Sequence, residues 1–104
     1  MKFFVVLSTA PDKKSALNIA RVLVQKKLAA CVSFREGWRS VYPWKGKIRI
    51  SSEVLILAKT SSKKIQALQQ AMIKIHPYAI PEILALPVSG GFSGYLGWLK
   101  DSLK

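Results

Sequence analysis

The residues of this sequence that could do chemistry are few and scattered. There is one histidine, His76, one cysteine, Cys31, and five acidic residues, at positions 12, 36, 53, 82 and 101. Catalysis needs a nucleophile beside a base, paired carboxylates, or a metal with an open coordination position. No such arrangement follows from the spacing, and no glycine-rich phosphate loop precedes a helix. The sequence therefore predicts a protein that is not an enzyme.

The single histidine and the single cysteine each have two interpretations. His76 precedes Pro77, and proline disfavours the helical conformation in the residue before it. We interpret His76 as a hydrogen-bonding residue at a helix end, with a lone metal ligand as the alternative. Cys31 stands among apolar residues of a predicted strand, which indicates a buried small hydrophobic side chain, with a metal ligand or a nucleophile as the alternative. One cysteine also excludes an intrachain disulfide and fits a reducing compartment, so we expect a cytoplasmic protein.

Length and composition limit the architecture and the partners. The chain has 104 residues, 50% of them hydrophobic, which predicts one domain over residues 1–104. Its first apolar run is too short for a signal peptide or a membrane span, so we expect no membrane partner. Lys and Arg total 17 against five acids, for a net charge of +12. Because the basic residues are spread along the chain, this charge indicates solubility and weak polyanion affinity, without a specific nucleic-acid partner.

Helical and extended patterns alternate along the chain. Apolar spacing predicts a helix after Asp12, its N-cap, and a second helix after the N-cap Ser61-Ser62 that ends at His76. A last strand over residues 80–88 contains two prolines, so we expect it to be short or at an edge. The remaining predicted elements are a first strand over residues 2–9 and a short C-terminal helix over residues 92–103.

Between the two helices the sequence predicts one long antiparallel hairpin. Its apolar limbs, 28–34 and 48–60, flank a tip at residues 42–47 that contains Pro and Gly. Charged and aromatic residues alternate near this tip, which predicts one basic and one aromatic face. The basic face is either an ordinary solvated strand surface or a surface that binds anions. The alternating residues are Arg35, Arg39, Lys45, Lys47 and Arg49 on one parity and Phe34, Trp38 and Tyr42 on the other.

This order, β-α-β-β-α-β with a terminal helix, predicts an α+β fold, the ferredoxin-like βαββαβ sandwich. In that fold two helices cover one face of a four-stranded sheet and leave the other bare. The strands within residues 3–7, 54–57 and 83–86 are nevertheless apolar on both parities. Strands of this kind are buried on both sides, and a large bare apolar face is an interaction surface. We therefore expect oligomerisation through the open face.

Several short segments spread over nearly the whole chain form a recognisable set. They are Ser8-Thr9-Ala10-Pro11-Asp12, Lys27-Leu28-Ala29-Ala30-Cys31-Val32, Tyr42-x-Trp44-x-Gly46-Lys47-Ile48, Ser52-Glu53-Val54, Lys59-Thr60, His76-Pro77-Tyr78-x-x-Pro81-Glu82 and Tyr95-Leu96-x-Trp98-Leu99. Together they resemble the CutA family of divalent-cation-tolerance proteins. The resemblance implies a ferredoxin-like protomer, a tight homotrimer with strands paired between subunits, a cytoplasmic location, and a link to copper and other divalent metals.

At the copper site of that family, the resemblance carries over only in part. The family's copper ligands are a cysteine at the position of Ser8 and two adjacent histidines at the positions of Ile75 and His76. Only His76 remains, and a soft metal prefers thiolate and imidazole donors. We therefore expect weak copper binding through His76, with no metal required for folding.

The resemblance also places a polar and aromatic set, Trp44, Lys59, Tyr78 and Glu82, near inter-subunit clefts, where it would bind a ligand. The alternatives are interface packing for Trp44 and Tyr78 and an ion pair between Lys59 and Glu82.

Three classes of function remain open from the sequence. The first is a trimeric protein of metal tolerance or metal response. The second is a module resembling the trimeric PII signalling proteins, which would bind a small anion through Lys59 and the basic hairpin tip. The third is an RNA binder, and it ranks last because residues 47–50 lack the stacking aromatic residues of RNA-recognition strands.

Overall fold

The computed structural model of the chain describes residues 2–104, and it has the predicted ferredoxin-like α+β architecture. Four strands form one sheet in the order β2-β3-β1-β4, and every neighbouring pair is antiparallel. The elements are β1 (Phe3–Ala10), α1 (Lys13–Gln25), β2 (Cys31–Trp44), β3 (Lys47–Ser61), α2 (Ile65–Ile75), β4 (Ile83–Pro87) and α3 (Ser93–Ser102).

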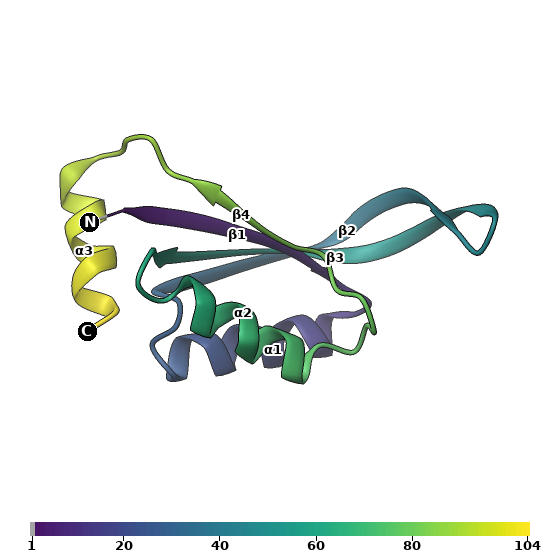
Figure 1. Cartoon of the computed structure of the whole chain (residues 1–104), viewed down its shortest axis with the longest axis horizontal. Coiled ribbons are helices and arrows are strands. Elements are labelled where there is room, and N and C mark those ends of the chain that lie inside the picture. The colour runs from purple at the N-terminus through teal and green to yellow at the C-terminus, as the bar shows by residue number, and fades with distance from the viewer. Residues whose placement is uncertain (1) are drawn as a thin grey trace.

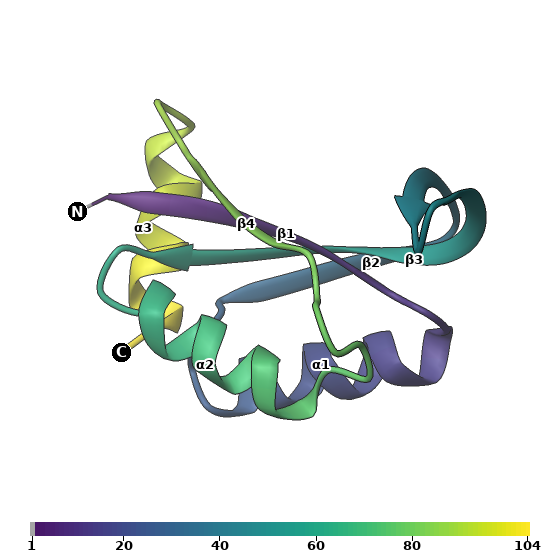
Figure 2. The same cartoon turned by 45° about the vertical axis from the view of Figure 1, so that its right-hand side comes forward.

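The core lies between the sheet and the helices α1 and α2, which run side by side under one face of the sheet (Figures 1 and 2). The even-numbered residues of the central strands β1 and β3 point toward these helices. The buried apolar set that joins the two layers is Val6, Ala10, Ala16, Ile19, Leu23, Ala29, Val54, Ile56, Ala58, Leu68 and Met72. Burying one large side chain of this kind stabilises the fold by about 1.5–3 kcal/mol.

One end of each core helix and the place of β4 follow the sequence prediction, and the start of α2 departs from it. Asp12 caps α1 by accepting a hydrogen bond from the Ser15 N–H at 2.8 Å, as predicted. α2 ends at Ile75 before the His76-Pro77 pair, also as predicted, and β4 is a short strand at the sheet edge. The predicted cap at Ser61-Ser62 is wrong. Ser61 pairs with Phe3 as the last residue of β3, and α2 begins at Ile65 without a side-chain cap.

The β2–β3 hairpin is longer than the predicted limbs, and its turn is tighter. Trp44 and Lys47 are the last paired residues, so Lys45 and Gly46 alone make the turn. Both have positive φ, 51° and 77°, as a two-residue hairpin turn requires. The hairpin extends well beyond the helices at one end of the molecule (Figure 1).

A β-bulge in β2 overturns the predicted division of the hairpin into a basic and an aromatic face. The pairing shifts between Arg35 and Trp38, and Gly37 adopts a positive φ of 81° there. An extra residue in one strand sends all later side chains to the opposite face. Beyond the bulge, aromatic and basic residues share one face, where Tyr42 lies opposite Arg49 and Trp44 opposite Lys47. The other face is exposed and carries Val41, Ile48 and Ile50 together with Arg39.

The face of the sheet opposite α1 and α2 is apolar and only partly covered. Helix α3 lies at the end of the sheet near the N-terminus, where it lines a small cavity with Val5 and Lys59 (Figure 1). Leu84 and Leu86 of β4 remain 53% and 46% exposed. Cys31 also lies on this face and is half-buried, less than the buried side chain that the sequence predicted.

Candidate binding site at the base of the hairpin

His76 connects the loop that follows α2 to the end of β1 through hydrogen bonds. Its Nε2 lies 2.9 Å from the Thr9 carbonyl oxygen, and its Nδ1 lies 3.2 Å from the Tyr78 backbone nitrogen. A carbonyl only accepts and a backbone N–H only donates, so Nε2 carries the proton and Nδ1 accepts. Burial lowers the pKa of His76 and favours this neutral form. Both ring nitrogens are therefore engaged by the backbone.

The same loop places Tyr78 against the hairpin. The Tyr78 hydroxyl donates to a carboxylate oxygen of Glu53 at 2.7 Å, and Glu53 is only 8% exposed. Burial raises the pKa of Tyr78 far above its usual range, and the hydrogen bond to Glu53 adds to the effect. The hydroxyl thus keeps its proton and remains a donor to Glu53 at physiological pH. The rings of Tyr78 and His76 lie 5.1 Å apart, so the loop is held as one packed unit.

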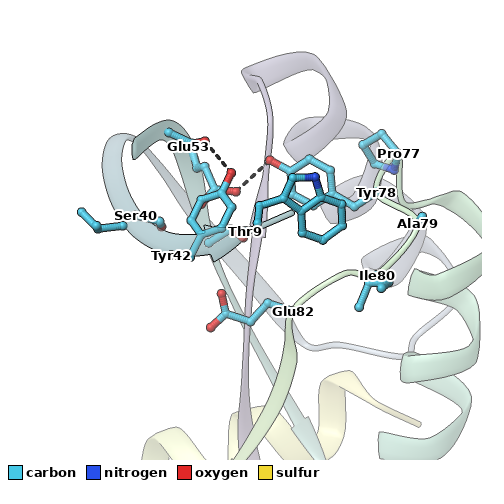
Figure 3. A pocket seen from close by; sticks show the side chains of 12 residues that line it. Thr9, Ser40, Tyr42, Glu53, Pro77, Tyr78, Ala79, Ile80 and Glu82 are labelled. Carbon is cyan, nitrogen blue, oxygen red and sulfur yellow. Dashed lines mark hydrogen bonds between the residues drawn. The ribbon is translucent and has the colours of Figure 1, made fainter. Parts of the chain in front are cut away.

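Between this loop and the hairpin lies a cavity of about 670 Å³, shown in Figure 3. Cavities of this size hold small organic ligands. Its polar and aromatic lining consists of Tyr42, Trp44 and Ser40 from β2, Ser51 and Glu53 from β3, Thr9 from β1, and Tyr78 and Glu82 from the segment before β4. The Tyr42 hydroxyl lies 2.6 Å from the Ser51 Oγ, which fixes that ring across the strand pair. Among its lining residues there is no Lys or Arg.

The structure brings together three of the four residues that the resemblance placed in a cleft. Trp44, Tyr78 and Glu82 line this cavity, whereas Lys59 lies elsewhere in the sheet. The Lys59 ammonium is 5.5 Å from the centre of the Tyr95 ring of α3. Within residues 2–104, the expected ion pair between Lys59 and Glu82 does not form.

Two residues of the cavity, Tyr42 and Glu53, were missed from the sequence. Tyr42 could have been found, because it stands two residues before Trp44 and alternate residues of a strand share a face. Glu53 had a weaker signal, an acid that begins the apolar run Val54-Leu55-Ile56. Its burial beside Tyr78 depends on a contact between residues 25 positions apart.

The described residues do not fit a soft-metal centre. Within residues 2–104 there is no group of three or more His, Cys, Asp or Glu side chains that could hold a metal ion. Ser8, at the family's cysteine position, is fully buried, and its Oγ has no hydrogen-bond partner in the described chain. A hydroxyl is a poor donor for copper, and the nitrogens of His76 are already bonded.

Fold and cavity together define a small α+β protein with a long hairpin and a cavity at its base, and the comparisons with known proteins give its family. Residues 4–102 match the family model described as "CutA1 divalent ion tolerance protein". The chain belongs to the CutA family.

Similarity to individual members extends over almost the whole chain. This chain is 48% identical to the divalent-cation tolerance protein CutA of Pectobacterium atrosepticum over 100 residues. The match covers 96% of this chain and 91% of that protein. The chain is 41% identical to the chloroplastic protein CutA of Arabidopsis thaliana, but spans only 55% of that protein's length. The crystal structure of CutA from Xylella fastidiosa superimposes with a TM-score of 0.97 at 39% identity, covering 100% of both chains. The Pectobacterium relative is named for divalent-cation tolerance, and none of these three names states an enzymatic activity.

Proposed function

We propose that this chain is a non-catalytic, homotrimeric protein of divalent-metal tolerance in the cytoplasm, with weakened copper binding. Membership in the CutA family supports the link to divalent cations. No helix within residues 2–104 is long and apolar enough to cross a membrane.

The observation that carries the weakened copper binding is the bonding of His76. Copper(II) would need a ring nitrogen with a free lone pair, and the only lone pair of the neutral ring, on Nδ1, accepts from the Tyr78 N–H. Binding must therefore break a hydrogen bond in a loop that is packed against Glu53 and Thr9. Ser8 offers no thiolate to compensate for this loss.

Isothermal titration with copper(II) tests this part of the proposal. We expect weak binding in the native chain and weaker binding in His76→Ala. The double change Ser8→Cys and Ile75→His should tighten binding, by about 10–100-fold if it behaves like other changes around a metal site. Glu36→Gln, on the exposed hairpin, is the control for a change elsewhere on the surface. Tight binding that persists in His76→Ala would contradict the proposal.

The proposed homotrimer is supported by the open face of the sheet. Leu55 and Leu57 of β3 lie half-buried there, and Leu84 and Leu86 lie exposed on the same face across β1. An apolar face of this kind is stable in water only when another surface covers it. A second copy of the chain provides a matching apolar face, because every copy has the same one.

The charge of the chain predicts how salt affects this assembly. Three protomers at +12 each repel one another, and salt screens that repulsion over about 10 Å at 0.1 M. Buried apolar contacts depend far less on salt, so the melting temperature should rise from low to moderate NaCl and then level off. Differential scanning calorimetry at several NaCl and protein concentrations measures this melting temperature. A melting temperature that falls with added NaCl would show that favourable ion pairs outweigh the repulsion.

The alternative, a PII-like module for a small anion, has less support. The hairpin cavity has two carboxylates and no Lys or Arg in its lining, so it would repel an anion. Lys59, which that alternative requires, lies beside Tyr95 instead.

A further inference from the structure

The hairpin cavity has the opposite charge character to the rest of the molecule. The chain has 17 Lys and Arg and five Asp and Glu. Two of those five acids, Glu53 and Glu82, line the cavity, and none of the basic residues does. In Figure 3 the two carboxylates lie on opposite sides of the Tyr42 ring. The lining of this cavity is thus acidic in a chain whose net charge is +12.

Aromatic rings form much of the remaining wall. Tyr42, Trp44 and Tyr78 come from two separate parts of the fold, the hairpin and the loop after α2. Both tyrosine hydroxyls are tied to neighbouring side chains, Ser51 and Glu53, so these two rings are held in position. The faces of such rings carry negative potential and attract a cation, most strongly for tryptophan.

The rest of the lining argues against a bare metal ion. Hard cations such as Ca²⁺ require six or more oxygen ligands, and Mg²⁺ an octahedral set. The cavity lining instead includes the apolar residues Pro77, Ala79 and Ile80 besides the two carboxylates. Apolar walls with a few polar groups suit a ligand that has an apolar body and a charged end.

We propose that this cavity binds a small organic cation, an alkylammonium or alkyldiammonium compound whose ammonium group meets Glu53 or Glu82 and whose carbon chain packs on Tyr42, Trp44 and Tyr78. The proposal does not depend on metal tolerance or on copper, because His76 and Ser8 do not line the cavity.

Two basic side chains of the hairpin itself lie on the same face as these rings. Lys47 and Arg49 lie opposite Trp44 and Tyr42 in the β2–β3 pairing, on the same face and exposed to solvent. Their positive charges also repel an incoming ammonium group. Removing them should therefore strengthen binding, in contrast to removing the carboxylates.

The test uses probes that share a five-carbon chain and differ in charge. Isothermal titration of the full chain with pentylammonium, 1,5-diaminopentane, 1-pentanol and pentanoate should show binding at millimolar concentration for the two amines only. The diamine should bind more tightly, and added salt should weaken both. The size of the protein is measured in the same samples, because a second copy that covers the cavity would abolish binding and refute the proposal.

Variants then locate the site. Glu82→Gln and Trp44→Leu should each weaken amine binding by about 3–30-fold, the range of a partly desolvated cation–π or charge contact. Glu36→Gln removes the same charge outside the cavity and should leave binding unchanged. The double change Lys47→Ala and Arg49→Ala should tighten amine binding. Equal binding of 1-pentanol or pentanoate, or equal losses in Glu36→Gln and Glu82→Gln, would overturn the proposal.

Discussion

Replacing His76 by alanine is expected to lower the free energy of unfolding by about 2–4 kcal/mol, because two buried backbone groups lose their partners. The Thr9 carbonyl would lose a donor 2.9 Å away, and the Tyr78 N–H would lose an acceptor. Few single substitutions of a polar residue cost this much. Urea denaturation of the native chain and the variant measures the difference.

His76→Gln is the matched control. The amide nitrogen of glutamine reaches about as far as Nε2 and can still donate to Thr9, while the contact to Tyr78 is lost. We expect a loss about half that of alanine. Equal stability of the alanine variant and the native chain would show that these hydrogen bonds contribute nothing net.

The same histidine should make stability depend on pH. Its pKa is lowered by burial, so near and below the usual value of 6.5 the unfolded chain binds a proton that the folded chain resists. The free energy of unfolding therefore falls as the pH drops from 7.5 to 5.5. The contribution of His76 to this pH dependence disappears in His76→Gln. Asp12, whose pKa is lowered by the Ser15 N–H, acts only below its usual value of 3.8, so the two effects are separable.

Replacing Leu84 by glutamate is expected to dissociate the proposed trimer. Leu84 lies on the open face of the sheet and is 53% exposed in one chain, so the change costs an isolated protomer little. In an assembly that covers this face, the glutamate would be buried without a partner, which costs several kcal/mol. A loss of about 3 kcal/mol would raise the dissociation constant about 100-fold.

Analytical ultracentrifugation separates the 11.6 kDa chain from an assembly three times that mass. Ile73→Glu is the control, because Ile73 is 51% exposed but lies on the outer side of α2. Both substitutions lower the net charge equally, so a difference between them reports position alone. If Leu84→Glu and the native chain sediment alike as trimers, the open face is not the interface. If the native chain is a monomer, the trimer proposal fails.

Much of the fold could be predicted because its causes are local. The helical spacing of Ile65, Leu68, Met72 and Ile75 decides which side of α2 is buried, and the proline after His76 ends that helix wherever it packs. Two-sided apolar strands likewise predict a sheet that needs covering on both faces. These patterns extend over neighbouring residues, so the sequence by itself determined the order of elements and the ferredoxin-like topology.

The cavity required the tertiary structure, because its geometry depends on contacts between distant residues. The bulge at Gly37 reverses every later side chain of β2, and no alternation rule reveals that reversal in advance. Likewise, Glu53 meets Tyr78 only because His76 attaches the α2–β4 loop to β1, across 67 residues. The sequence alone determined which side of each helix faces the core. The folded chain decided which side of each strand does so, and it decided that carboxylates and aromatic rings share one cavity. That depends on the register of the hairpin against a loop from the other half of the chain.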